Sequence, residues 1–204
     1  METGLWITAL LSAAAAIALG ILVAQRPPTK LDRAGGLLRG AALEGAVFFT
    51  ALGRWPVLAG LGALAFGVAM TLGTGLTDVA ILLATQTLSQ AASTLMKLGY
   101  HRPRPPGWLR IRETDLSYPS GHALSALVFF VGFAVLAWHA PLARPAGTVL
   151  AGLLVACALG IVWSRLALDA HYLTDVIGGV LFGTAFLCTA LALIVHVVPQ
   201  VSAA

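Results

Sequence analysis

Three short groups of residues in this 204-residue chain combine side chains that phosphate chemistry uses. The groups are Lys97 with Arg104-Pro105 after six intervening residues, the run Pro119-Ser120-Gly121-His122, and Ser164-Arg165 followed by His171 and Asp175. Cations bind phosphoryl oxygens, backbone amides at a helix start form an anion seat, and imidazoles attack phosphorus or move protons. The three groups together predict a phosphate site.

The three cations are informative because placing positive charge near hydrocarbon costs free energy. Lys97, Arg104 and Arg165 each lie near the end of a long apolar stretch. Three converging positive charges near hydrocarbon repel one another unless an anion compensates them. A plain alternative is that each side chain only extends to the lipid headgroups. A bound phosphate would account for all three cations, since Arg binds phosphate in a bidentate manner. We expect a pocket of cations without an acidic cluster that could hold a metal ion.

Ser120 and Gly121 stand where an apolar helix should begin. The first amides of a helix lack internal partners and carry the positive end of the helix dipole. Glycine allows a ligand oxygen to approach closely, and the Ser120 hydroxyl can add one more donor.

Two histidines can share the chemical work. If the last helix begins early enough, His171 and Asp175 lie four residues apart on one helical face. A carboxylate on one ring nitrogen fixes the tautomer and leaves the other nitrogen free to attack, while His122 can protonate the leaving oxygen. A metal site on His122, His171 and Asp175 is the alternative, but the nearby cations would repel the ion. We expect packed or interfacial roles for His139 and His196, and His101 lies inside the first group without an assigned role.

Composition shows what must position these residues. The chain is 59% hydrophobic and 10% charged, whereas soluble domains have about 25% charged residues. We therefore predict an all-α polytopic membrane protein, a single domain over residues 1–204 with its motif core at about 50–195. The basic residues flank apolar stretches or belong to the three groups, which excludes nucleic-acid binding. Cys157 and Cys188 lie in apolar runs and indicate small core residues.

Six apolar segments are long enough to cross a bilayer of about 30 Å. They are Gly4–Ala24, Pro56–Leu72, Thr77–Leu98, Ser120–His139, Gly147–Leu168 and Thr174–Val198. The first follows a start without basic residues, so we expect a retained span and not a signal peptide. Between the first two spans, Gln25 to Trp55 alternates leucines with charged residues and predicts an amphipathic helix in the membrane interface, or else a polar loop.

With six spans, the first, third and fifth connections share one face, and all three groups meet there. That face also holds eleven of the twelve Lys and Arg residues, Arg144 being the exception. The positive-inside rule accordingly predicts a cytoplasmic site.

The three groups resemble the complete signature of the type-2 phosphatidic acid phosphatase superfamily, which includes lipid phosphatases, glucose-6-phosphatase and vanadium haloperoxidases. The resemblance covers about residues 50–195 and implies six helices, no cofactor, and metal-independent hydrolysis through a phosphohistidine. It assigns His171 as nucleophile, Asp175 as its partner and His122 as acid/base. It assigns the phosphoryl oxygens to Lys97, Arg104, Ser120, Gly121 and Arg165. The bacterial lipid phosphatases of this family usually act on the outer face, against the charge bias, so the side of the site is left open.

We therefore expect a membrane phosphatase for a lipid phosphate or pyrophosphate such as phosphatidic acid, phosphatidylglycerol phosphate or a polyprenyl pyrophosphate. Its partner is the lipid in the bilayer, entering laterally between helices, and no protein partner is required. Two other functions fit less well. A vanadate-dependent haloperoxidase has no need of six spans, and a non-catalytic lipid-binding or transport protein need not retain all eight polar residues.

Overall fold

The computed structural model describes the chain apart from residues 1, 25, 108, 111–112, 141–143 and 202–204. Its described part is helical and contains no strand. The helices, in chain order, are α1 (Glu2–Val23), α2 (Lys30–Gly35), η1 (Gly36–Leu38), α3 (Leu43–Leu52), α4 (Trp55–Leu72), α5 (Leu76–Tyr100), α6 (Gly121–Ser125), η2 (Ala126–Val131), α7 (Gly132–His139), α8 (Arg144–Ala167) and α9 (Leu173–Val201).

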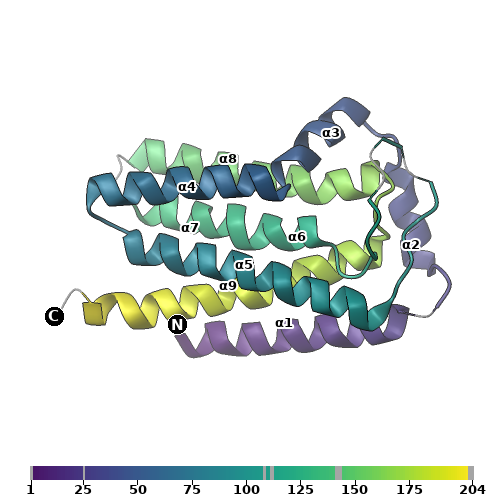
Figure 1. Ribbon diagram of the computed structural model, residues 1–204, viewed down its shortest axis with the longest axis horizontal. Helices are drawn as coiled ribbons and strands as arrows, with labels where there is room; N and C mark the ends of the chain where they lie inside the picture. The colour runs from purple at the N-terminus through teal and green to yellow at the C-terminus, as the bar shows by residue number, and fades with distance from the viewer. Residues whose placement is uncertain (1, 25, 108, 111–112, 141–143, 202–204) are drawn as a thin grey trace.

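Within the described part of the chain, six helical spans are long and apolar enough to cross a membrane, as predicted. The fourth is the continuous run Gly121–His139, made of α6, η2 and α7. Figure 1 shows the long helices running side by side, with α1 packed along α9. The connections α1–α4, α5–α6 and α8–α9 lie together at one end, on the right of Figure 1, so the three groups of polar residues do share one end.

The segment between the first two spans is helical, but it is not one amphipathic helix. Its two parts, Lys30–Leu38 and Leu43–Leu52, meet at an angle of 108°. Leu37 is 87% exposed, whereas Asp32 is 5% exposed and points into the protein. The polar face predicted from the alternation is therefore wrong at Asp32, because this carboxylate accepts hydrogen bonds from Thr174 in α9. Gln25, the first residue of the predicted segment, lies outside the described residues.

Two glycines of α9 allow the start of the fourth span to approach closely. A Cβ atom on Gly179 would collide with the carbonyl oxygen of Ser120, and one on Gly183 would come within 3.0 Å of the carbonyl oxygen of Leu124. The small residues therefore let α6 lie directly on α9, as expected for packing in lipid, where helices associate through close backbone contact. This contact holds Ser120 against the helix that carries Asp175.

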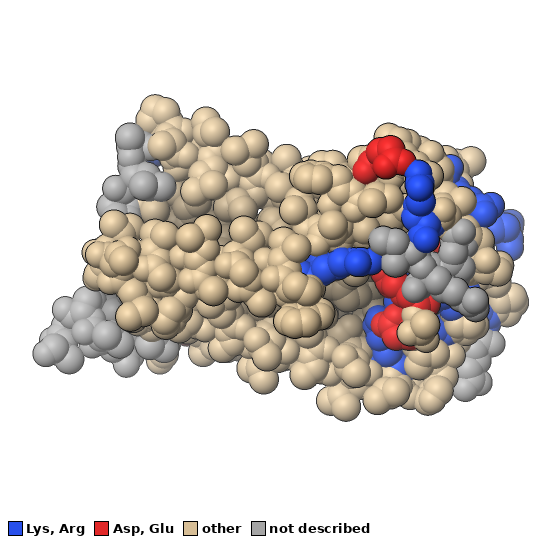
Figure 2. Space-filling model, turned by 45° about the horizontal axis from the view of Figure 1, so that its top comes forward, with Lys and Arg blue, Asp and Glu red and all other residues tan. Residues whose placement is uncertain are grey.

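The charged residues gather at one end of the molecule. On the face drawn in Figure 2, most Lys, Arg, Asp and Glu residues cluster at the end that holds the connections, and most of the rest of that face is uncharged. Arg112, one of the eleven cations assigned to this face, lies outside the described residues.

Candidate active site

The cluster of charges surrounds a cavity of about 440 Å³, and residues from each of the three groups line its wall. Among the residues lining it are Lys97, Arg104, Gly121, His122 and His171. Lys97 is in the last turn of α5, His122 is in α6, and His171 lies in the turn before α9. Arg165, Ser120 and Asp175 are buried, each with at most 1% of its surface exposed. The predicted residues thus form one site, with some at the cavity wall and others behind it.

His171 faces the cation Arg104. Its Nε2 atom is 2.8 Å from Nη1 of Arg104. A guanidinium only donates hydrogen bonds, so Nε2 is the accepting nitrogen and the neutral ring carries its proton on Nδ1. Burial, followed by the charges of Arg104 and Arg165, holds the pKa of His171 well below its ordinary value. The ring nitrogen next to the cation is therefore unprotonated, which a nucleophile requires.

Asp175 supports His171 through a different geometry from the one predicted. Helix α9 begins at Leu173, so His171 precedes it and the two residues do not share a helical face. Nδ1 of His171 is 3.7 Å from Oδ2 of Asp175, too far for a good hydrogen bond. Ser117 lies between them, since its hydroxyl is 2.5 Å from the same carboxylate oxygen and 3.4 Å from Nδ1. The sequence analysis missed Ser117, which no spacing rule marks.

Arg102 is a second residue that the sequence analysis missed. It is 2% exposed and forms ion pairs with Asp175, at 2.5 Å, and with Asp32, at 2.9 Å. The sequence alone places Arg102 only among the cations of one membrane face, yet carboxylates bind it on both sides. The repeated Arg-Pro step, Arg102-Pro103 before Arg104-Pro105, is a sequence signal that could have drawn attention to it.

Two carboxylates that the sequence analysis did not single out lie within the cluster of cations. Glu113 binds Arg104 at 2.8 Å and Arg165 at 2.5 Å. Asp115 binds Lys97 and Arg104. Burial raises the pKa of Asp115, but its bonds to Lys97 and Arg104 outweigh this and hold the pKa below its usual range. Carboxylate oxygens therefore contact the same cations that a phosphate would need.

The predicted anion seat at Ser120 and Gly121 is a helix start, as expected. Ser120 is the N-cap of α6, and its hydroxyl accepts a hydrogen bond from the amide of Ala123. Its own amide is already used, because it donates to the carbonyl oxygen of Asp175 at 3.0 Å. A ligand oxygen thus has access to the helix start through Gly121, which lines the cavity.

His122, the second residue of α6, also lines the cavity. Its Nε2 atom is buried and has no hydrogen-bond partner among the described residues. The ring packs on Gly53, where an added Cβ atom would come within 2.7 Å of Cδ2 of His122. A buried ring nitrogen without a partner is costly unless it meets one during function, and a substrate oxygen in the cavity would supply it.

An apolar groove adjoins the cavity. It has a volume of about 440 Å³ and shares Gly53, Trp55 and Gln90 with the cavity wall. Its remaining lining comes from α4, α5 and the fourth span, and includes Leu58, Leu83 and Phe129. The polar cavity and an apolar surface of the bundle are therefore continuous.

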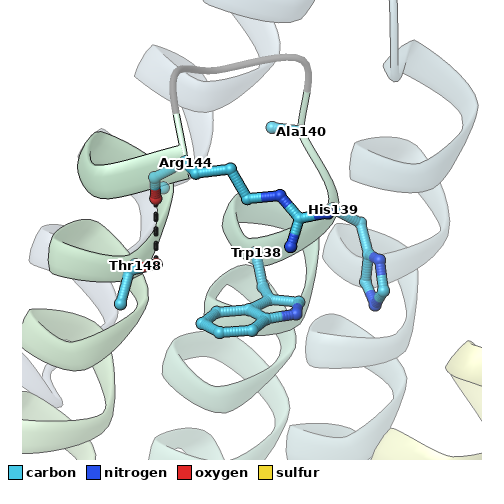
Figure 3. A pocket seen from close by; sticks show the side chains of 6 residues that line it. Trp138, His139, Ala140, Arg144 and Thr148 are labelled. Atoms are coloured by element: carbon cyan, nitrogen blue, oxygen red, sulfur yellow. Dashed lines mark hydrogen bonds between the residues drawn. The ribbon is translucent and has the colours of Figure 1, made fainter.

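A separate cavity at the other end of the molecule lacks such chemistry. Figure 3 shows Trp138, His139 and Arg144 around it, with Thr148 donating a hydrogen bond to the carbonyl oxygen of Arg144. His139 is exposed there, and His101 and His196 line neither this cavity nor the polar one. Cys157 and Cys188 are free thiols.

Comparisons with known proteins agree with this geometry. The family model of the PAP2 superfamily matches residues 78–199. A similar solved structure is the crystal structure of a transmembrane PAP2 type phosphatidylglycerolphosphate phosphatase from Bacillus subtilis. It has a TM-score of 0.71 and 23% sequence identity, over 96% of each chain. A search of curated proteins gives no match.

Proposed function

Because the chain belongs to the PAP2 superfamily, we propose that it is an integral membrane phosphatase that hydrolyses a lipid phosphate or pyrophosphate through a phosphohistidine. The observation that carries this proposal is the contact between Arg104 and Nε2 of His171 at the wall of the cavity that also holds His122. A phosphoryl group bound to the guanidinium would lie next to the attacking nitrogen.

The reaction has two steps. First, Nε2 of His171 attacks phosphorus, so that the P–N bond forms while the P–O bond to the lipid breaks and His122 gives its proton to the leaving oxygen. Second, His122 removes a proton from water, whose oxygen attacks phosphorus and breaks the P–N bond. Inorganic phosphate leaves, and both histidines return to their starting protonation states.

The phosphoryl oxygens would be bound by Lys97, Arg104, Arg165, the Ser120 hydroxyl and the helix start at Gly121. To bind there, a phosphate must displace the carboxylates of Glu113 and Asp115 from the same cations. Asp175, fixed by Ser117 and Arg102, would stabilise the positive charge that develops on His171 in the first step.

The apolar groove gives the lipid tail a place. Its continuity with the cavity through Gly53 and Trp55 supports a substrate that keeps its chain among the helices while its phosphate reaches His171. This arrangement favours lateral entry from the bilayer, as anticipated from the sequence.

The test is hydrolysis of short-chain lipid phosphates by the purified protein, with release of inorganic phosphate as the readout. Acid-labile labelling at His171 with a radioactive substrate supports the mechanism, and turnover without any labelled enzyme contradicts it. Peroxide-dependent halogenation in the presence of vanadate would identify the haloperoxidase alternative instead. Binding of the lipid without turnover would indicate a transport or binding protein.

A further inference from the structure

One cation of the cavity belongs to none of the three groups. Arg54 lies at the N-terminal end of α4 and lines the cavity together with His122 and His171. It directly follows Gly53, the residue on which the His122 ring packs. Arg54 is therefore placed beside the histidine proposed to protonate the leaving oxygen.

The surroundings of Arg54 differ from those of the other cavity cations. Lys97, Arg104 and Arg165 are paired with Glu113 or Asp115. Among the described residues, no carboxylate is recorded within ion-pair distance of Arg54, and Arg54 is exposed while lining the cavity. Its charge also acts on both His122 and Arg165. An anion entering on the leaving-group side would find this guanidinium available.

Arg54 also stands where a headgroup would meet its lipid tail. Its two neighbours in sequence, Gly53 and Trp55, are shared between the polar cavity and the apolar groove. A lipid with its tail in the groove and its terminal phosphate at His171 would carry the atoms between them past Arg54.

Resting on the proposed function, we infer that Arg54 is a subsite for a second phosphate group, the one that leaves with the lipid. In a lipid diphosphate this is the phosphate attached to the chain, and in phosphatidylglycerol phosphate it is the phosphodiester. Arg binds either group through charge-assisted, bidentate hydrogen bonds. Hydrolysis of phosphatidic acid releases an uncharged diacylglycerol, which has no phosphate for Arg54 to bind. The site therefore favours lipids with two phosphate groups.

The experiment compares three soluble short-chain substrates: dioctanoyl phosphatidic acid, dioctanoyl phosphatidylglycerol phosphate and farnesyl diphosphate. For each, kcat/KM is measured with the wild-type protein, Arg54→Gln, Arg54→Lys and the control Arg144→Gln. Arg144 is a matched control because it is an exposed arginine in the cavity at the other end of the molecule. Thermal unfolding of each variant checks that it is folded.

We expect Arg54→Gln to lower the ratio of kcat/KM for a two-phosphate substrate to that for phosphatidic acid by about 10- to 100-fold, the range of a charged hydrogen bond. Arg54→Lys should keep part of the preference, and Arg144→Gln should keep all of it. A loss confined to the diphosphate, or to phosphatidylglycerol phosphate, still supports the subsite and identifies which second phosphate it binds.

An equal loss of activity on all three substrates would show that Arg54 serves the transferred phosphate, and an unchanged ratio would show that it binds no second one. Either result overturns the inference while leaving the proposed function intact. A wild-type protein that hydrolyses none of the three substrates refutes the proposed function itself, and the subsite with it.

Discussion

Nη1 of Arg104 and Nε2 of His171 are 2.8 Å apart; this contact sets the tautomer of the ring and, after burial, is the next cause of its lowered pKa. The guanidinium keeps the facing nitrogen unprotonated, and an incoming phosphate would bring its negative charge to the same point. The first prediction follows from this pair.

Formation of the phosphoenzyme should persist below the pH at which an ordinary histidine becomes protonated. Burial and the charges of Arg104 and Arg165 lower the pKa of His171, so the ring stays neutral as the pH falls through about 6.5. Rapid-quench labelling with para-nitrophenyl phosphate, from about pH 8 to about pH 5, measures this. A loss of labelling centred on the ordinary histidine value would contradict the assignment.

The lowered pKa of His171 also makes the free energy of unfolding depend on pH. Below about pH 6.5 the unfolded chain binds a proton at His171 that the folded protein does not. The stability contributed by the neutral ring is thus complete above that pH and is lost as the pH falls toward the folded value. His171→Gln should flatten this part of the curve of unfolding free energy against pH.

Turnover should not depend on a metal ion. Lys97 and Arg104 line the cavity and Arg165 lies behind its wall, and the carboxylates of Glu113 and Asp115 are paired with these three cations. Hydrolysis of dioctanoyl phosphatidic acid is expected to continue in excess EDTA at its original rate. Activity that EDTA abolishes and that zinc or magnesium restores would disprove the mechanism.

Vanadate should inhibit the protein, and Glu113→Gln should strengthen that inhibition. A five-coordinate vanadate resembles the phosphoryl transition state, and analogues of that state bind tightly. Because Glu113 forms ion pairs with Arg104 and Arg165, removing its charge should lower the inhibition constant for vanadate by about tenfold. Glu44→Gln is the control, since Glu44 is exposed and pairs only with Arg110 among the described residues. Weaker inhibition of the Glu113 variant would show that this carboxylate helps the anion to bind.

The two histidines should fail in different ways. His171→Ala removes the nucleophile and should leave no covalent intermediate. His122→Ala removes proton transfer, an effect of about 10²–10⁴-fold, yet para-nitrophenyl phosphate needs little protonation of its leaving group. Rapid-quench labelling should therefore detect phosphohistidine in the His122 variant, followed by slow hydrolysis. Equal labelling of the His171 variant would reverse the assignment.

Asp175→Asn should lower activity by an amount between those of the two histidine variants, because it keeps a polar partner for His171 but loses the negative charge.

Arg102→Gln should impair both stability and turnover. It leaves Asp32 and Asp175 without their shared cation, and breaking a buried ion pair costs about 3–5 kcal/mol. For a chain of this length, that lowers the unfolding midpoint by about 10 °C. The control Arg110→Gln removes an exposed pair with Glu44, worth about 0–1 kcal/mol. A change in kcat without a change in KM would indicate that Arg102 acts on His171 through Asp175, and an unaltered kcat would limit Arg102 to a structural role.

The sequence predicted the six spans and the common location of the three groups, because span length and motif spacing are local properties. Ser117, Arg102 and Glu113 were missed for a common physical reason. Their importance comes from contacts with residues far away in the chain, and a polar residue in a connecting loop resembles any other until the fold brings its partner close. Asp32 illustrates this. The leucine alternation around it indicates an exposed face, yet its carboxylate is buried and accepts a hydrogen bond from Thr174.

The partners Asp32 and Thr174 are 142 positions apart, which has a consequence for how the protein is made. Synthesis begins at the N-terminal end, so Asp32 and Arg102 exist long before α9 supplies Thr174 and Asp175. His171 also comes from the late part of the chain. A nascent chain inserted into the bilayer thus holds Lys97, Arg104 and His122 before it holds His171 and Asp175. Hydrolytic capacity would arise in a single step, when the last helix joins the bundle, and partly made copies would leave the surrounding lipids untouched.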